Sequence, residues 1–131
     1  MFVAVCQTPI RTKSGSGYHW TEKPLTGSRF MFDVEATSDA IVALSSKEKK
    51  PDDMYKIFIG GKKNTESTIH RIKSGILTEA ETFNFVSPTE FKMFWITWSL
   101  DGTIAVGREN ETQPFLEYKD PNPLPIMYML D

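Results

Sequence analysis

The sequence predicts an all-β fold, in the form of an antiparallel two-sheet β-sandwich or jelly roll. Short runs rich in β-branched and aromatic residues recur along the chain, and Gly, Pro, Asp or Asn bounds each of them. Residues 29–36 alternate apolar and polar side chains, as a half-buried strand does. Residues 91–108 hold two such runs on either side of Asp101-Gly102, a dipeptide typical of tight β-hairpins.

About ten strands are expected along the chain, separated by turn residues. Residues 77–85 are ambiguous, because Leu77 to Glu81 could begin a helix. The alternation of Phe83 and Phe85, without a helical apolar repeat, favours a strand there. The expected strands are residues 2–8, 18–20, 29–36, 40–44, 55–59, 67–72, 77–85, the two strands of the hairpin, 115–118 and 126–130, with a stiff Pro-rich turn at residues 120–123.

The hairpin is expected to have a two-residue loop, because Asp tolerates and Gly freely adopts positive φ. Both faces of the hairpin are apolar, which places it in the middle of a sheet. One face would lie in the core, and the other would lie under a loop or form the floor of a groove. The expected pairs are Trp98 with Ala105, Ile96 with Gly107 and Trp95 with Arg108, so that Phe94, Ile96 and Trp98 lie above small residues and Met93, Trp95, Ile104, Val106 and Arg108 share the other face.

Size, charge and cysteine content narrow the functional classes. We expect a single β-sandwich domain over residues 1–131. The net charge of −2, from 15 basic and 17 acidic residues, gives no electrostatic reason to expect nucleic acid or an anionic membrane as a partner. Cys6 is the only cysteine, so neither an intrachain disulfide nor a thiolate metal site can form. No apolar run reaches the roughly 20 residues that span a bilayer, and we expect a soluble chain without a signal peptide or membrane insertion.

The sequence holds no pattern typical of a catalytic, metal or cofactor site. His19 and His70 lack spaced metal-ligating partners, and no Gly-x-Ser-x-Gly motif is present. Residues 60–63, Gly-Gly-Lys-Lys, differ from a phosphate-binding loop and are more simply a turn. Asp33 and Glu35 share a strand face, as the carboxylates of some β-sandwich glycosidases do, although a solvated face is the favoured interpretation. We expect no catalytic residue, no metal and no cofactor.

What remains is a set of aromatic and planar polar side chains in a β scaffold. Sugars suit this set, because their C–H faces stack on indoles while their hydroxyls need polar partners. Trp95 and Trp98 are three residues apart and face opposite ways, so one of them is the better ligand candidate and the other a core residue. Arg108 opposite Trp95 has the alternative role of a cation–π partner. The candidate ligand-binding residues are Trp95, Trp98, Asn64, His70, Arg71 and Arg108.

Four segments carry a family resemblance. They are FxFxVxAxxDAIVALS at residues 30–45, YKIxIGGxxNxxSxIxR at 55–71, FWITWS with IxVGR at 94–108, and PFLxYxDP at 114–121. In order and spacing, the chain from Gly17 to about Tyr128 resembles the farnesoic acid O-methyltransferase-like domain of many invertebrate proteins. The resemblance implies an all-β sandwich similar to galectin-like and concanavalin-like lectins. The family name implies methyl transfer from S-adenosylmethionine to farnesoic acid, whereas the binding and adhesion modules that often accompany the domain imply a binding role.

The sequence therefore favours a non-catalytic module that recognises a glycan or another small molecule on a concave sheet face or its rim loops. The methyltransferase that the family name implies is the first alternative. The second alternative is a structural domain that assembles with itself or binds another protein. A homodimer through an edge strand is expected if the last strand is left uncovered.

Overall fold

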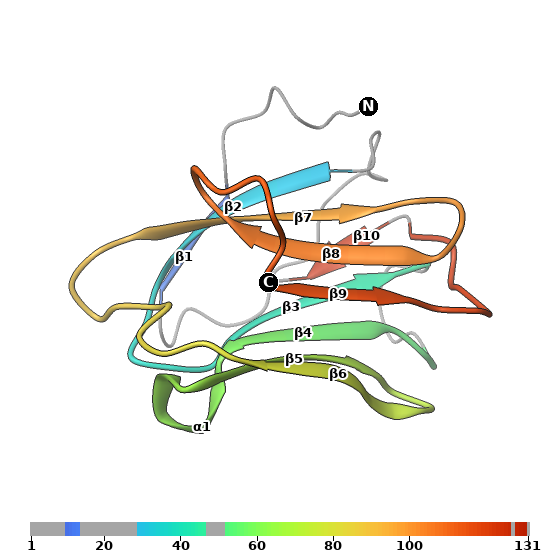
Figure 1. Ribbon diagram of the computed structural model, residues 1–131, viewed down its shortest axis with the longest axis horizontal. Helices are drawn as coiled ribbons and strands as arrows, with labels where there is room; N and C mark the ends of the chain where they lie inside the picture. The colour runs from blue at the N-terminus through green and yellow to red at the C-terminus, as the bar shows by residue number, and fades with distance from the viewer. Residues whose placement is uncertain (1–9, 14–28, 47–51, 127, 131) are drawn as a thin grey trace.

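The computed structural model describes residues 10–13, 29–46, 52–126 and 128–130, and these form two five-stranded sheets packed face to face (Figure 1). Sheet A has the strand order β1-β2-β7-β8-β9, and sheet B has the order β10-β3-β4-β5-β6. Neighbouring strands are antiparallel except for the parallel pair β1–β2. The predicted two-sheet β-sandwich is confirmed. The elements are β1 (Ile10–Lys13), β2 (Arg29–Glu35), β3 (Ala40–Ser45), β4 (Tyr55–Gly60), α1 (Gly61–Asn64), β5 (Glu66–Arg71), β6 (Gly75–Glu81), β7 (Lys92–Trp98), β8 (Thr103–Arg108), β9 (Leu116–Lys119) and β10 (Tyr128–Leu130).

Most expected strands lie close to their predicted positions. The ambiguous segment forms a strand, β6, although it ends before Phe83. The parallel strand β1 was not predicted, and the expected strands over residues 2–8 and 18–20 lie outside the described residues. The element α1 is a single turn in which Lys62, Lys63 and Asn64 have positive φ, so it is left-handed rather than a helix of the ordinary hand.

The core fills the space between the inner faces of the sheets. Phe30, Phe32, Val34 and Ala36 are all buried, as predicted for residues 29–36. Asp33 is also buried, at 6% exposure, so the solvated face expected for Asp33 and Glu35 is not formed at Asp33. The rings of Phe32 and Phe94 join neighbouring strands of sheet A at a centroid distance of 5.8 Å. Sheet B faces them with the wholly buried side chains of Leu44, Ile57, Ile59 and Ile69.

The hairpin between β7 and β8 has a three-residue loop, so the predicted two-residue loop and its pairs are wrong. The observed pairs are Trp98 with Ile104, Thr97 with Ala105, Ile96 with Val106, Trp95 with Gly107 and Phe94 with Arg108. The amide of Ser99 donates to the Thr103 carbonyl at 3.0 Å, and only Gly102 in the loop has positive φ. Asp101 instead accepts hydrogen bonds from the Thr103 amide and the Ser99 hydroxyl.

This shift of one residue moves the side chains of β8 to the opposite face of the sheet relative to those of β7, because side chains alternate along a strand. Ile104 and Val106 join Phe94, Ile96 and Trp98 on the inner face, where they contribute to the core cluster. Trp95 lies on the outer face above Gly107. The hairpin is central in sheet A, as predicted, with β2 on one side and β9 on the other.

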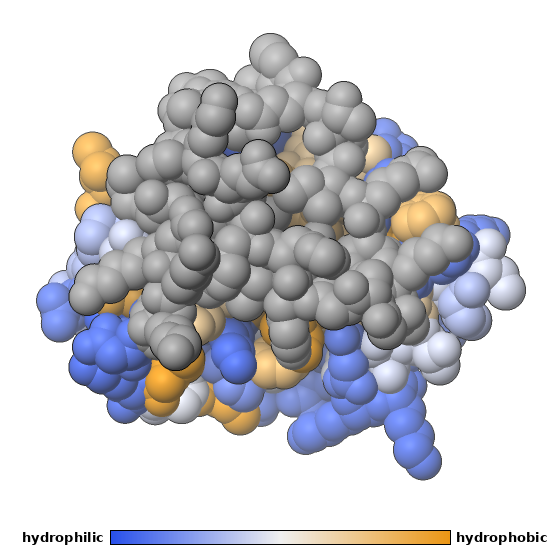
Figure 2. All heavy atoms as spheres, turned by 180° about the vertical axis from the view of Figure 1, so that it is seen from behind, coloured by the Kyte–Doolittle hydropathy of each residue, from blue (hydrophilic) through white to orange (hydrophobic). Residues whose placement is uncertain are grey.

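The part of the described surface that is visible from behind is mixed in polarity. Figure 2 shows hydrophilic and hydrophobic residues interspersed around the rim of the molecule as seen from behind. No helix in this part of the chain is long and apolar enough to span a bilayer. The exposed large apolar side chains among the described residues are Ile72, Ile76, Phe83 and Leu100. Ile72 lies in the turn between β5 and β6, Ile76 lies on β6, an edge strand of sheet B, and Phe83 follows that strand.

We predict that Gly102→Ala destabilises the fold by about 3 kcal/mol or more, because both conformation and space demand glycine there. Gly102 has a φ of 93°, and an added Cβ would lie 2.2 Å from the carbonyl oxygen of Asp120. Gly75→Ala is the matched control, since Gly75 has a φ of 87° but no atom within 4 Å of its added Cβ. It should cost only about 1–2 kcal/mol of backbone strain. Urea unfolding measures both, and equal losses would show that the Asp120 contact is unimportant.

Candidate ligand-binding site

The structure distributes the six predicted ligand-binding residues over both sheets. Trp95 and Arg108 lie near the connection between β8 and β9 in sheet A, whereas Trp98 lies at the hairpin end of β7. Asn64, His70 and Arg71 belong to α1 and β5 of sheet B. A single site built from all six is therefore not formed.

Asn64 and His70 are both engaged with neighbouring groups of the fold. The Asn64 side chain donates to the Val86 carbonyl at 2.7 Å and accepts from the Val86 amide at 3.3 Å, which ties α1 to the chain after β6. The His70 ring lies on the outer face of sheet B, 4.7 Å from the Phe58 ring, with its Nε2 2.9 Å from the Thr68 hydroxyl. Burial and the nearby Lys56 ammonium lower the pKa of His70, so it is neutral at pH 7.

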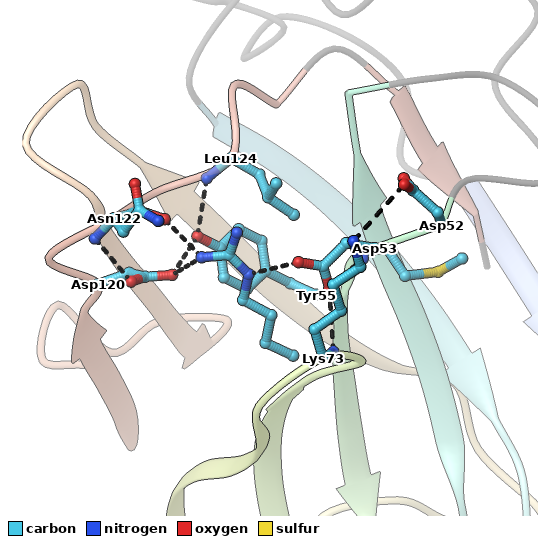
Figure 3. A network of polar contacts seen from close by, with 9 residues as sticks. Asp52, Asp53, Tyr55, Lys73, Asp120, Asn122 and Leu124 are labelled. Atoms are coloured by element: carbon cyan, nitrogen blue, oxygen red, sulfur yellow. Dashed lines mark hydrogen bonds and ion pairs between the residues drawn. The ribbon is translucent and has the colours of Figure 1, made fainter.

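A nearly buried polar network that includes Asp53, Tyr55 and Asp120 joins β5 to the chain after β9 (Figure 3). Arg71 is at its centre. Its Nε donates to Asp53 at 2.8 Å, and its Nη1 donates to Asp120 at 2.6 Å and to the Asn122 carbonyl. The hydroxyl of Tyr55 donates to the same Asp120 carboxylate at 2.7 Å. Arg71 thus cross-links segments that are far apart in the sequence.

The network sets the ionisation of its members. Burial and the hydrogen bond to Asp120 raise the pKa of Tyr55 to about 12. Burial opposes the charged forms of Asp53 and Asp120, but hydrogen bonds outweigh it and hold the pKa of each below 3.8. The donors are Arg71 and two backbone amides for Asp53, and Tyr55, the Asn122 amide and Arg71 for Asp120. The network is therefore a set of charge-assisted hydrogen bonds at neutral pH.

Trp95 lies flat on the outer face of sheet A because its cross-strand partner is Gly107. A Cβ at position 107 would lie 2.1 Å from the indole ring, so only glycine leaves room for it. The indole Nε1 donates to the carbonyls of Arg108 and Glu111, at 3.1 and 3.0 Å. The guanidinium of Arg29 lies 5.2 Å from the ring centroid. Trp95 therefore fixes the start of the β8–β9 connection against sheet A.

Arg108 does not stack on Trp95, so the predicted cation–π pair is wrong. The register shift places Arg108 on the other face, where its guanidinium lies 4.1 Å from the centroid of the Phe85 ring. Its Nη2 donates to the Glu111 carboxylate at 2.6 Å, and its buried Nε has no partner among the described residues. Arg29, which the sequence analysis did not select, is the cation beside Trp95.

A row of cross-strand neighbours on the outer face of sheet A forms a pocket beside Trp95. The row runs across four strands as Arg29, Thr97, Ala105 and Glu117. Because Ala105 is small, a hollow of about 350 Å³ opens in the middle of the row. We call it the sheet A pocket; its polar and aromatic lining is Arg29, Trp95, Thr97, Glu111, Thr112 and Glu117.

A second hollow of about 410 Å³ lies next to this one and shares Glu111 with it. Arg108, Lys92 and Asn84 line it, together with Phe85 and Phe91. Glu111, in the β8–β9 connection, thus lines both polar hollows, and Arg108, its ion-pair partner, lines the second one. Guanidinium, carboxylate and hydroxyl groups beside an aromatic ring can bind a polyhydroxylated molecule.

Comparison with known proteins identifies the family. The family model described as farnesoic acid O-methyl transferase matches residues 13–129. The chain belongs to this family. No curated protein matches its sequence. The described part of the chain also holds no group of three or more His, Cys, Asp or Glu side chains placed to bind a metal ion.

Three solved structures with a similar fold are described as glucanases or as a glycosidic hydrolase. A prokaryotic β-1,3-1,4-glucanase (lichenase) from a mouse hindgut metagenome superimposes with a TM-score of 0.61 at 16% identity, over 86% of this chain and 55% of that one. A native glycosidic hydrolase superimposes with a TM-score of 0.62 at 16% identity, over 92% of this chain and 59% of that one. The Bacillus licheniformis β-glucanase superimposes with a TM-score of 0.60 at 12% identity, over 86% of this chain and 55% of that one. The chain thus spans a little over half the length of these enzymes and shares their jelly-roll fold.

The family description implies S-adenosylmethionine, and we tested whether the described residues fit it. The glycine-rich turn at residues 60–64 is filled by its own neighbours, because a Cβ on Gly60 would lie 2.8 Å from Val86 and 2.9 Å from the Asn64 amide oxygen. It joins two antiparallel strands, β4 and β5, and not a parallel strand to a helix. Residues 60–64 therefore form no glycine-rich cradle for this cofactor.

We predict that Arg71→Met destabilises the fold by about 3–5 kcal/mol at pH 7, because it leaves Asp53 and Asp120 charged and nearly buried. In the wild type, carboxyls with lowered pKa stabilise the fold above pH 3.8 and lose this contribution as the pH falls. In the variant the same carboxyls take up protons more easily. The difference in unfolding free energy between the two proteins should therefore shrink between pH 5 and pH 3.

Urea unfolding at pH 7, 5 and 3 checks this prediction. Lys73→Met is the control, because Lys73 pairs with Asp52 at 3.6 Å with both side chains mostly exposed. It should change stability by less than about 0.5 kcal/mol. A loss in Arg71→Met that does not vary with pH would contradict the electrostatic role of the network.

Proposed function

We propose that this chain is a non-catalytic glycan-recognition module that binds a short saccharide in the sheet A pocket. The observation that carries the proposal is the row of Arg29, Thr97, Ala105 and Glu117 beside the Trp95 indole. This row offers donors, acceptors and an aromatic edge around one hollow on a sheet face. Its volume of about 350 Å³ lies at the small end of the ligand-pocket range, which fits a short saccharide.

The chemistry of the lining matches vicinal hydroxyl groups. Arg29 presents several N–H donors in one plane, and the Glu117 carboxylate accepts two hydrogen bonds side by side. The hydroxyls of Thr97 and Thr112 both donate and accept. Trp95 is only 7% exposed and its indole N–H is already bound to two carbonyls, so its contribution is limited to the exposed edge of the ring.

The solved structures support a carbohydrate as the ligand class. The similar proteins are glucanases and a glycosidic hydrolase, so this sandwich serves proteins that act on polysaccharides. At identities of 12–16%, the likeness shows the fold alone and does not name a sugar for this chain. Mixed-linkage β-1,3-1,4-glucan is the first ligand to test because one of those enzymes is named for it.

The proposal is for binding without catalysis. Of the two carboxylates in the pocket, Glu111 is held by Arg108 at 2.6 Å, which ties it to a structural partner. The methyltransferase alternative needs a cofactor for which residues 60–64 provide no cradle. Calorimetric titration with S-adenosylmethionine and an assay of glucan hydrolysis test the two catalytic alternatives, and a positive result in either contradicts this part of the proposal.

We predict that Glu117→Ala lowers affinity for the bound saccharide about tenfold or more, because a hydrogen bond to a charged acceptor is lost. Thr97→Val should lower it several-fold, since the shape is kept and only a hydroxyl is removed. A glycan array followed by titration with the best ligand gives the affinities. Neither change should alter urea unfolding by more than about 1 kcal/mol, because both side chains lie on the outer face.

Glu81→Ala is the matched control, since Glu81 is an exposed carboxylate on the edge strand of sheet B. Its affinity should equal that of the wild type. The proposal fails if the wild type binds no saccharide, or if all three variants bind it equally.

The homodimer through the last strand stays a prediction. β10 is the edge strand of sheet B opposite β6, and it pairs with β3 on one side. Light scattering at increasing protein concentration checks it, and a constant monomer mass would contradict it.

A further inference from the structure

A pocket of about 630 Å³ lies at the hairpin end of the sandwich, apart from the sheet A pocket. We call it the turn pocket. One wall is the end of β7 and the start of β8, and the other is the Pro-rich segment 123–126 before β10. The lining residues that matter to the argument are Tyr55, Trp98, Leu100, Ile104, Leu124 and Ile126.

The local sequence explains why the pocket is open. The three-residue loop pairs Trp98 with Ile104 on the inner face of sheet A. Pro123 and Pro125 lack amide hydrogens, so segment 123–126 cannot pair as a regular strand and leaves the sheet edge. The Leu124 amide donates instead to the Tyr55 hydroxyl at 3.1 Å, which fixes the far wall. Figure 3 shows Leu124 beside Tyr55, next to the Arg71 network.

The charge of the pocket limits what it can bind. Among the described lining residues the only ionisable side chain is Tyr55, which is neutral at physiological pH. The carboxylate next to it, Asp120, is held by Arg71, and the Asp101 carboxylate at the loop lies 3.8 Å from Lys119. The described walls therefore offer no free cation to an acidic ligand, whereas Trp98, Leu124 and Ile126 offer apolar surface.

We propose that the turn pocket binds a neutral apolar small molecule, such as a hydrocarbon chain or ring that carries at most a hydroxyl group. Its volume is typical of small-molecule sites. A carboxylate on the same skeleton binds more weakly, because it loses its hydration without gaining a cationic partner. The turn pocket is independent of the proposed glycan site. Its preference for a neutral ligand also distinguishes it from a site for farnesoic acid, the carboxylic acid in the family description.

The test uses fluorescence of N-phenyl-1-naphthylamine, a neutral apolar probe, with the complete chain at pH 8. We expect saturable binding that farnesol displaces, with farnesoic acid weaker by at least about tenfold. The saccharide that binds the wild type should not displace the probe, so the proposals for the two sites are tested independently. Absence of saturable binding, or equal displacement by alcohol and acid, would overturn the proposal.

A designed cation sharpens the test. In Ile126→Lys the long aliphatic stem can stay against the apolar wall while the ammonium reaches the pocket mouth. This variant should bind the acid more tightly than the alcohol, which reverses the wild-type order. Ile76→Lys is the control, because Ile76 is exposed on β6, outside the pocket lining. The same reversal in Ile76→Lys would overturn the proposal, and the wild-type comparison of alcohol and acid decides the question if Ile126→Lys does not fold.

Discussion

The arrangement of the described chain depends on the conformation of Gly102 in the hairpin loop. Its positive φ, with the hydrogen bonds that Asp101 accepts from Ser99 and Thr103, closes a loop of three residues. That length sets the pairing of β7 with β8 and hence the face on which each side chain lies. Trp98 turns into the sandwich and Trp95 turns out of it. The two tryptophans therefore belong to different pockets.

The same glycine connects the hairpin to the Arg71 network. The Asp120 amide donates to the Gly102 carbonyl at 2.9 Å, and the lack of a side chain at Gly102 leaves room for the Asp120 carbonyl. Asp120 in turn accepts from Arg71 and Tyr55. A chain of short contacts thus runs from the loop through the chain after β9 to β4 and β5. It holds both walls of the turn pocket in place.

Much of the fold could be predicted from the sequence, because strand alternation and turn residues are local signals. The loop length could not, since Asp-Gly suits both a two-residue loop and a three-residue loop with glycine at the positive-φ position. The hydrogen bonds of Asp101 favour the longer loop, and they appear only in three dimensions. Because of this one difference in loop length, the sequence predicts Arg108 as the cation beside Trp95, whereas the structure has Arg29 there.

The candidate site was harder to predict for a related reason. Asn64 and Arg71 were selected as planar polar groups, but their partners Val86, Asp53 and Asp120 lie far away in the sequence. Arg29 and Glu117 occupy outward positions on strands, where a ligand-binding residue and a solvated one look alike. Only the strand order of sheet A brings them into one row with Thr97 and Ala105.

The most direct test of this account follows the indole N–H signals of Trp95 and Trp98 by NMR, assigned with Trp→Phe variants. Titration with the saccharide should shift the Trp95 signal alone, and titration with farnesol should shift the Trp98 signal alone. Such a result would show two separate pockets on opposite faces of one hairpin. A ligand that shifts both signals, or the opposite one, would contradict the central claim that the hairpin register divides the two tryptophans between two sites.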